Sequence, residues 1–176
     1  MQEKVKIIKQ SGIDNLKHSY IDISIAEQCL KLIEHNTVLF EAKISSAKNG
    51  MGEQSDSGCT PRGWHIIRAK IGADCPIHTV FRVRRPTGEI YSEQLHKMAP
   101  ERDWILTRIL WLSGLEVGLN RLGQQDTMRR YIYIHGCPDI YPIGVPESHG
   151  CIRMRNKQLI ELFDLVETEI PVYLHE

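Results

Sequence analysis

The 176-residue sequence has no excess of charge of either sign, because 22 lysines and arginines balance 22 aspartates and glutamates. Without a basic surplus there is no electrostatic basis for binding nucleic acid or an anionic membrane surface. No apolar run approaches the length of about 20 residues that a transmembrane helix needs. Internal repeats and low-complexity tracts are also absent. With 41% hydrophobic and 25% charged residues, the composition is typical of a soluble globular protein.

The sequence also lacks the cysteine spacing of a disulfide framework. An odd number of cysteines without a Cys-x-x-Cys pair argues against thiol–disulfide exchange and suits a reducing compartment. The five are Cys29, Cys59, Cys75, Cys137 and Cys151. Residues 1–18 contain neither the hydrophobic core nor the cleavage site of a signal peptide. We therefore expect a cytoplasmic protein in which residues 1–18 form an N-terminal extension.

Strand patterns are frequent along the chain. Period-two alternation of apolar and polar residues, typical of half-buried strands, covers much of the first third, with a hairpin turn at His35 and Asn36. The expected strands cover residues 19–25, 29–34, 37–44, 64–70, 130–134 and 170–174. Residues 45–63 are rich in Ser, Gly, Asn and Asp and predict a long surface loop, and loops of this length are often functional.

Two segments have helical patterns. The first begins near Pro100 and ends at residues 113–114, and its apolar residues recur at helical spacing. The second begins after a predicted N-cap at Asn156 and carries apolar residues from Leu159 to Val166. The pattern predicts a mainly β protein with two helices (α+β), organised as a single domain over residues 19–176.

The tripeptide His-Gly-Cys occurs twice, at residues 135–137 and 149–151. A cysteine nucleophile needs an imidazole that promotes thiolate formation and backbone N–H donors for the oxyanion. The second tripeptide suits this chemistry, because Gly150 allows a turn that gathers N–H groups beside the sulfur of Cys151. His135, at the end of the strand predicted before it, can serve as the base. Cys137 is the poorer nucleophile because the proline that follows it lacks an N–H.

The chain contains His135, twelve intervening residues and then Ser-His-Gly-Cys-Ile-Arg-Met-Arg-Asn at residues 148–156. This pattern resembles the motif of the L,D-transpeptidases with the YkuD catalytic domain. Segments at residues 46–50, 58–63, 66–72 and 85–89 resemble upstream strands and loops of short bacterial members of that family. The resemblance extends from about residue 19 to residue 174. It implies a YkuD-like β-sandwich that carries a Cys/His active site.

By this resemblance, Cys151 is the nucleophile, His135 is the general base, and the Gly136 carbonyl orients the imidazole. Ser148, His149 and Gly150 would shape the oxyanion site, with the ring of His149 more structural than a second base. Arg153 would bind a substrate carboxylate or brace the loop. Tyr133 is a further substrate-binding candidate. The resemblance implies no cofactor and no metal.

The family attacks the carbonyl between an L-centre and a D-centre of a peptidoglycan stem peptide, releases D-alanine and forms a thioester. Transfer of the acyl group to water defines an L,D-carboxypeptidase, and transfer to an amine defines an L,D-transpeptidase. The expected cytoplasmic location favours the carboxypeptidase, acting on stem tetrapeptides during murein recycling. Carbapenem-type β-lactams are the expected covalent inhibitors.

The residues leave alternatives for carboxylate binding and for the class of site. Arg62, Arg84 and Arg85 are all candidates for gripping the terminal carboxylate of the substrate, and the sequence does not choose among them. An alternative from another class is a zinc-binding module that uses His135, Cys137, His149 and Cys151, although their spacing is not that of the usual zinc hairpin.

Overall fold

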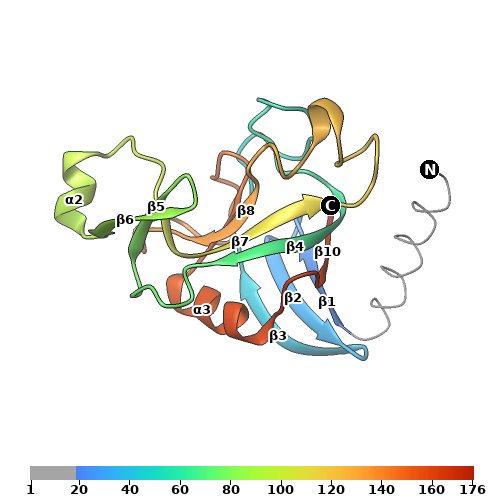
Figure 1. The fold of residues 1–176 in the computed structure, drawn as a ribbon, viewed down its shortest axis with the longest axis horizontal. Coiled ribbons are helices and arrows are strands. Elements are labelled where there is room, and N and C mark those ends of the chain that lie inside the picture. Colours follow the sequence, from blue (N-terminus) through green and yellow to red (C-terminus); the bar gives the residue numbers. More distant parts are fainter. Residues whose placement is uncertain (1–18) are drawn as a thin grey trace.

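A computed structural model describes residues 19–176, and the extension predicted for residues 1–18 lies outside the described residues. Its strands form one hydrogen-bonded sheet in the order β3-β2-β1-β10-β4-β7-β5-β6, while β8 pairs with β7 and β9 (Figure 1). The strands are β1 (Ser19–Ser24), β2 (Cys29–Glu34), β3 (Thr37–Lys43), β4 (Gly63–Ile71), β5 (Thr79–Arg82), β6 (Arg85–Ile90), β7 (Ile105–Gly114), β8 (Tyr133–Gly136), β9 (Ile152–Met154) and β10 (Pro171–His175). The helices are α2 (Glu93–Met98), α3 (Asn156–Leu165) and the short 3-10 turn η1 (Gly123–Gln125).

The strands predicted in the first third are confirmed. Their alternating residues place Ile21, Ile23, Leu30 and Leu32 on the buried side. The predicted turn between β2 and β3 is also present, and His35 and Asn36 have φ values of 47° and 63°. Two consecutive left-handed residues match the twist of the flanking strands, as in a type I′ hairpin turn.

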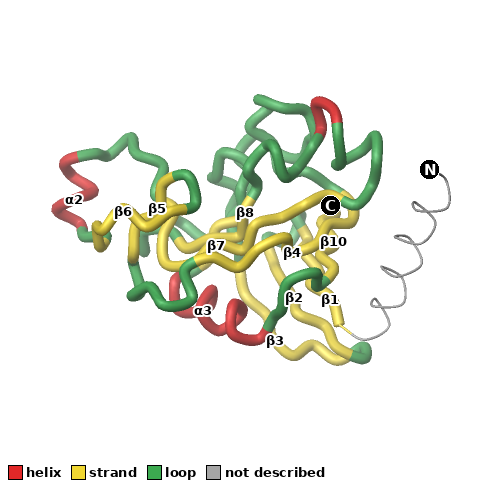
Figure 2. Tube along the Cα trace, viewed as in Figure 1, coloured by secondary structure: helices red, strands yellow, loops and turns green. Residues whose placement is uncertain are grey.

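The main hydrophobic core lies where the sheet curls over itself. Buried residues of β1–β3 face buried residues of β7, β8 and β9, and α3 adds Leu159, Leu162 and Phe163. The curl gives the sandwich arrangement, with the β5–β6 hairpin and α2 at one end of the molecule (Figure 1). Long loops gather on one side of β8 (Figure 2). The predicted fold class, mainly β with two helices, is confirmed.

The helix predicted from Pro100 to residues 113–114 is wrong, because this segment forms β7, a strand inside the sheet. Most residues of β7 are buried, five of them in succession, so the period-two alternation that identifies a half-buried strand is missing. A register shift between Leu106 and Ile109, with Thr107 at φ 73°, interrupts the alternation further. The isoleucines and leucines of β7 therefore recur at a spacing that is also typical of an amphipathic helix.

The second helix, α3, is confirmed, but its predicted N-cap is not. Arg155 occupies the cap position without a side-chain cap bond, and Asn156 is the first helical residue. The buried Asn156 side chain instead links three elements. Its Oδ1 accepts a hydrogen bond from Thr107 Oγ1 (2.6 Å), and its Nδ2 donates to the carbonyl of Cys137 (2.8 Å).

Several further elements were not predicted. β5, β6, β9 and α2 lie in segments without clear periodicity, and the strand expected at residues 130–134 is found at Tyr133–Gly136, so that His135 lies inside it. Among the described residues, no helix combines the length and apolar character required to cross a bilayer.

We predict that Asn156→Ala lowers the free energy of unfolding by about 2–4 kcal/mol, because it removes the acceptor of the buried Thr107 O–H and the donor to the Cys137 carbonyl. Urea denaturation measures the change. The matched control is Asn49→Ala, which removes one exposed hydrogen bond to Ser57 and should cost less than about 0.5 kcal/mol. Equal losses in both variants would contradict the linking role of Asn156.

Candidate active site

The parallel pairing of β8 with β9 determines which side chains meet. Ile134 pairs with Ile152 and His135 with Arg153. Ile134 and Ile152 face the main core, so His135 and Arg153 project from the opposite face of the sheet. Cys151 immediately precedes β9 and lies beside Tyr133, whose N–H donates to the cysteine sulfur over 3.3 Å. The nucleophile and the base predicted from the sequence therefore lie on one face of the sheet, His135 on β8 and Cys151 at the start of the neighbouring strand β9.

These side chains line a cavity of about 390 Å³. Six of the predicted site residues line it: Tyr133, His135, Ser148, His149, Cys151 and Arg153. Arg84 lines it as well, together with three polar or aromatic residues that were not predicted: Asp103, Arg130 and Tyr131. Arg84 had been one of three candidates for carboxylate binding, and of those three it alone lines this cavity.

His135 is almost fully buried, and its Nδ1 lies 2.8 Å from the carbonyl oxygen of Gly136. This is the contact that the family resemblance predicted. An Nδ1–H that donates to Gly136 leaves the lone pair on Nε2, which is the nitrogen free to accept a proton. Burial lowers the pKa of His135, and the nearby Asp103 carboxylate opposes that shift. The resting imidazole is therefore neutral at pH 7.

Cys151 is half-buried. Besides accepting the Tyr133 N–H, its thiol donates to the Tyr131 carbonyl over 3.4 Å. Burial raises the pKa of Cys151 to about 12, against the Tyr133 N–H bond and the positive charges of Arg153 and Arg130. The sequence predicts an imidazole that promotes formation of the thiolate. In the structure the resting pair is a neutral thiol and a neutral imidazole, so the proton must move during the attack.

The turn before Cys151 is held by its own residues. Ser148 is buried, and its hydroxyl donates to the Cys151 carbonyl (2.5 Å) and accepts the Gly150 N–H (3.3 Å). Gly150 has φ 133°, and a Cβ there would approach Ile132 Cδ1 to 3.3 Å. Ser148 therefore supports the turn in this structure, and the Gly150 N–H points to Ser148 rather than to a vacant oxyanion position.

The long loop predicted at residues 45–63 supports this turn from outside. Ser148 exchanges backbone hydrogen bonds with the loop, donating to Ser46 (2.8 Å) and accepting from Lys48 (2.9 Å). The Thr60 hydroxyl donates to the Gly150 carbonyl over 3.0 Å. The buried Gln28 side chain in turn bonds the backbone and hydroxyl of Ser46. The loop thus fixes the position of the turn that carries Cys151.

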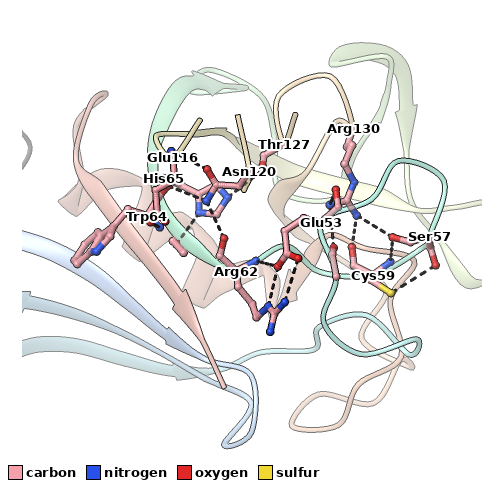
Figure 3. A network of polar contacts seen from close by, with 12 residues as sticks. Glu53, Ser57, Cys59, Arg62, Trp64, His65, Glu116, Asn120, Thr127 and Arg130 are labelled. Atoms are coloured by element: carbon pink, nitrogen blue, oxygen red, sulfur yellow. Dashed lines mark hydrogen bonds and ion pairs between the residues drawn. The ribbon is translucent and has the colours of Figure 1, made fainter. Parts of the chain in front are cut away.

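Arg130 connects the same loop to the cavity. Its guanidinium donates to the carbonyls of Gly52, Glu53 and Cys59, at 3.0, 2.9 and 2.5 Å (Figure 3). Cys59 is the residue before Thr60, so Arg130 holds the segment that reaches Gly150. Sequence reasoning missed Arg130, because nothing in the local pattern shows that its side chain turns toward a loop about 75 residues earlier.

A second part of the network ties this loop to residues 115–131 (Figure 3). Arg62 forms an ion pair with Glu53 (2.8 Å), and Asn120 Nδ2 donates to the Arg62 carbonyl. His65 is fully buried between the Gly63 carbonyl and the Thr127 hydroxyl, and burial lowers its pKa to about 4. Arg62 is therefore a scaffold residue.

Arg153 braces the loop in which His149 lies. Its guanidinium donates to the Glu147 carbonyl (3.0 Å) and lies 3.5 Å from Asp103. The His149 side chain is 79% exposed, with Nδ1 3.8 Å from the same carboxylate. Asp103 was missed because its segment was predicted to be helical. This arrangement favours the bracing role for Arg153 and a position at the cavity rim for His149.

The residues of the alternative zinc site do not converge. Cys137 is fully buried, does not line the cavity and directs its thiol to the Met154 carbonyl (3.7 Å). Burial raises its pKa to about 11. Within residues 19–176, no group of three or more His, Cys, Asp or Glu side chains is placed to hold a metal ion. The cysteines of the two His-Gly-Cys tripeptides therefore lie in different places, Cys137 in the interior and Cys151 at the cavity.

Comparison with known proteins agrees with this arrangement. The family model of YkuD, the L,D-transpeptidase catalytic domain, matches residues 18–174 of the chain. No curated protein matches the chain.

Solved structures share the fold at low sequence identity. A crystal structure of an L,D-transpeptidase from Xylanimonas cellulosilytica has a TM-score of 0.55 at 19% identity, over 90% of this chain and 60% of that one. L,D-transpeptidase 3 from Mycobacterium tuberculosis, in complex with a faropenem-derived adduct, has a TM-score of 0.55 at 15% identity, over 90% of this chain and 60% of that one. An Enterococcus faecium L,D-transpeptidase mutant has a TM-score of 0.55 at 16% identity, over 90% of this chain and 50% of that one. The chain therefore spans 50–60% of the length of these structures.

We predict that alkylation of Cys151 by iodoacetamide accelerates about tenfold per pH unit from pH 6 to pH 10 without a plateau, because the pKa near 12 keeps the thiolate fraction small. Peptide mapping by mass spectrometry measures Cys151 separately from the other four cysteines. His135→Ala serves as the control and should keep the same pH profile. A plateau below pH 7 that disappears in His135→Ala would instead reveal a resting thiolate–imidazolium pair.

Proposed function

Because the chain belongs to the YkuD family of L,D-transpeptidase catalytic domains, we propose that it is a cysteine enzyme that cleaves the L-to-D bond of peptidoglycan stem tetrapeptides. It releases the terminal D-alanine and transfers the acyl group to water, as an L,D-carboxypeptidase. The observation that carries this proposal is the placement of Cys151 and His135 in one cavity, with His135 on β8 and Cys151 immediately before the parallel neighbour β9.

The proposed reaction uses the neutral resting pair. His135 Nε2 takes the thiol proton while Cys151 sulfur attacks the carbonyl carbon of the third residue, which becomes a tetrahedral oxyanion. The C–N bond then breaks, His135 returns the proton to the amine of D-alanine, and a thioester remains on Cys151. Water attacks the thioester and gives a proton to His135. The proton passes to the departing sulfur, and the tripeptide leaves as a carboxylic acid.

The charge of the cavity supports a substrate with a free carboxylate. Three arginines, Arg84, Arg130 and Arg153, line it together with a single carboxylate, that of Asp103. Inside a cavity of limited solvent access, uncompensated guanidinium groups attract anions more strongly than at an open surface. A stem tetrapeptide brings such an anion at its C-terminus, next to the bond to be cleaved.

The proposed setting is the cytoplasm, where soluble stem peptides return from wall turnover and a tripeptide product can be reused. All five cysteines are free, which supports a reducing compartment. The faropenem-derived adduct of L,D-transpeptidase 3 from Mycobacterium tuberculosis supports covalent inhibition of this chain by β-lactams as well, through acylation of Cys151.

The test of the proposed function is incubation with a soluble tetrapeptide, with products followed by mass spectrometry. Loss of one alanine, with a tripeptide product, is the result expected for the carboxypeptidase. Cross-linked dimers, or exchange of the terminal residue when a D-amino acid is added, would overturn hydrolysis in favour of the L,D-transpeptidase.

We predict that Cys151→Ala lowers turnover more than about 1,000-fold, because the thioester cannot form. Cys137→Ala is the matched control and should retain most activity, because the Cys137 side chain is buried away from the cavity. The release of D-alanine is measured for both variants. Equal losses in the two would contradict the assignment of Cys151 as nucleophile.

A further inference from the structure

Arg84 differs from the other cavity residues because it lies in the tight turn of a β-hairpin. The β5–β6 hairpin pairs Arg82 with Arg85, so Val83 and Arg84 form its two-residue turn, with φ values of 50° and 62°. Such a turn is usually made of Asn or Gly, since a residue with a Cβ resists the left-handed region. Here a long cationic side chain occupies a position where glycine or asparagine would be less strained.

The Arg84 side chain lies on the aromatic residues beside Cys151. Its guanidinium carbon is 4.4 Å from the ring centre of Trp111 and 4.9 Å from that of Tyr131. Its Nη1 donates to the Tyr133 hydroxyl over 2.9 Å. The N–H of the same Tyr133 bonds the sulfur of Cys151, so one residue connects the guanidinium with the nucleophile. The stacking holds the guanidinium in one plane.

Most of the hydrogen-bonding capacity of Arg84 is unused. A guanidinium has five N–H donors, and within residues 19–176 only the bond to Tyr133 engages one of them. No carboxylate of the described residues lies within ion-pair distance of Arg84. By contrast, Arg62 is paired with Glu53, Arg102 with Glu89 and Arg153 with Asp103.

Arg130, the other unpaired arginine of the cavity, has its donors committed. Its guanidinium is shared among three loop carbonyls and the Ser57 hydroxyl. Arg84 is therefore the cavity guanidinium that combines a fixed plane, free donors and no counter-ion among the described residues. Planar recognition through two parallel N–H···O bonds is the geometry that suits a carboxylate.

We propose that Arg84, positioned by Trp111, Tyr131 and Tyr133, is a specificity-determining residue that binds the free C-terminal carboxylate of the peptide substrate. This inference rests on the proposed function. It identifies the side chain that distinguishes a peptide that ends beside the scissile bond from a peptide that continues beyond it. A chain that is amidated or extended at this end would place an uncharged group against a half-buried guanidinium, leaving its donors poorly paired.

A stem peptide can carry a second carboxylate, on the side chain of its third residue, and the same guanidinium would bind it by the same chemistry. The experiment therefore uses four tetrapeptides. They end either in a free carboxylate or in an amide, and their third residue either has or lacks a side-chain carboxylate. The kcat/KM for loss of the fourth residue is measured for wild type, Arg84→Lys, Arg84→Gln and the control Arg85→Gln.

For wild type we expect kcat/KM to be about 10- to 100-fold higher for the free acid than for the amide, as for a hydrogen-bonded charged group. Arg84→Gln should reduce this acid-to-amide ratio to nearly one by slowing the acid, and Arg84→Lys should restore part of it. Arg85→Gln should keep the wild-type ratio, because Arg85 is exposed on the same hairpin and does not line the cavity.

The proposal is overturned if Arg84→Gln slows acid and amide equally, or neither. It is also overturned if the loss depends on the side-chain carboxylate of the third residue instead of the terminal one. Thermal unfolding and the rate of Cys151 alkylation at high pH show whether Arg84→Gln keeps a folded site, and Arg84→Lys repeats the comparison if it does not.

Failure of the proposed function gives a different result. The same assays are run with and without an added D-amino acid acceptor. Release of the fourth residue only in the presence of the acceptor would overturn hydrolysis, while the acid-to-amide ratio under that condition would still test Arg84, because the attack on the peptide precedes the choice of acceptor.

Discussion

The parallel pairing of β8 with β9 is the constraint on which the site depends. In paired strands, side chains at matching positions point to the same face. Ile134 and Ile152 enter the core, and this fixes Tyr133, His135, Cys151 and Arg153 on the other face. A shift by one residue would exchange the two sets. The burial of apolar side chains therefore selects the register that also brings Cys151 and His135 into one cavity.

The cavity keeps its reactive pair neutral and provides charge nearby. Burial raises the pKa of Cys151 and lowers that of His135, so neither group is ionised at rest. Three guanidinium groups surround the pair, with Asp103 as the single carboxylate of the lining. Neutral groups in a cationic pocket suit the proposed reaction, in which negative charge arrives with the substrate and develops on its carbonyl oxygen.

Arginines of identical chemistry have different roles in this structure because their partners differ. Arg62 is paired with Glu53 in the scaffold, and Arg130 holds the 45–63 loop through its carbonyls. Arg153 is divided between Glu147 and Asp103. Arg84 rests on aromatic rings with most of its donors free. The number of partners that each guanidinium has within the protein determines how much remains for a ligand.

The sequence by itself determined what depends on local pattern. Alternation identified β1–β3 and their turn, and helical spacing identified α3. The block at residues 148–156 with His135 identified the family and predicted Cys151 as the nucleophile. Tertiary structure decided the rest. β7 is buried on both sides, so its strand pattern is hidden, and Asn156 serves a buried network instead of a helix cap. Asp103, Arg130 and Arg84 reach the cavity that Cys151 lines from distant segments. Such contacts depend on how strands pair across the sheet, and that pairing is set by burial of the whole core, which no short window of sequence contains.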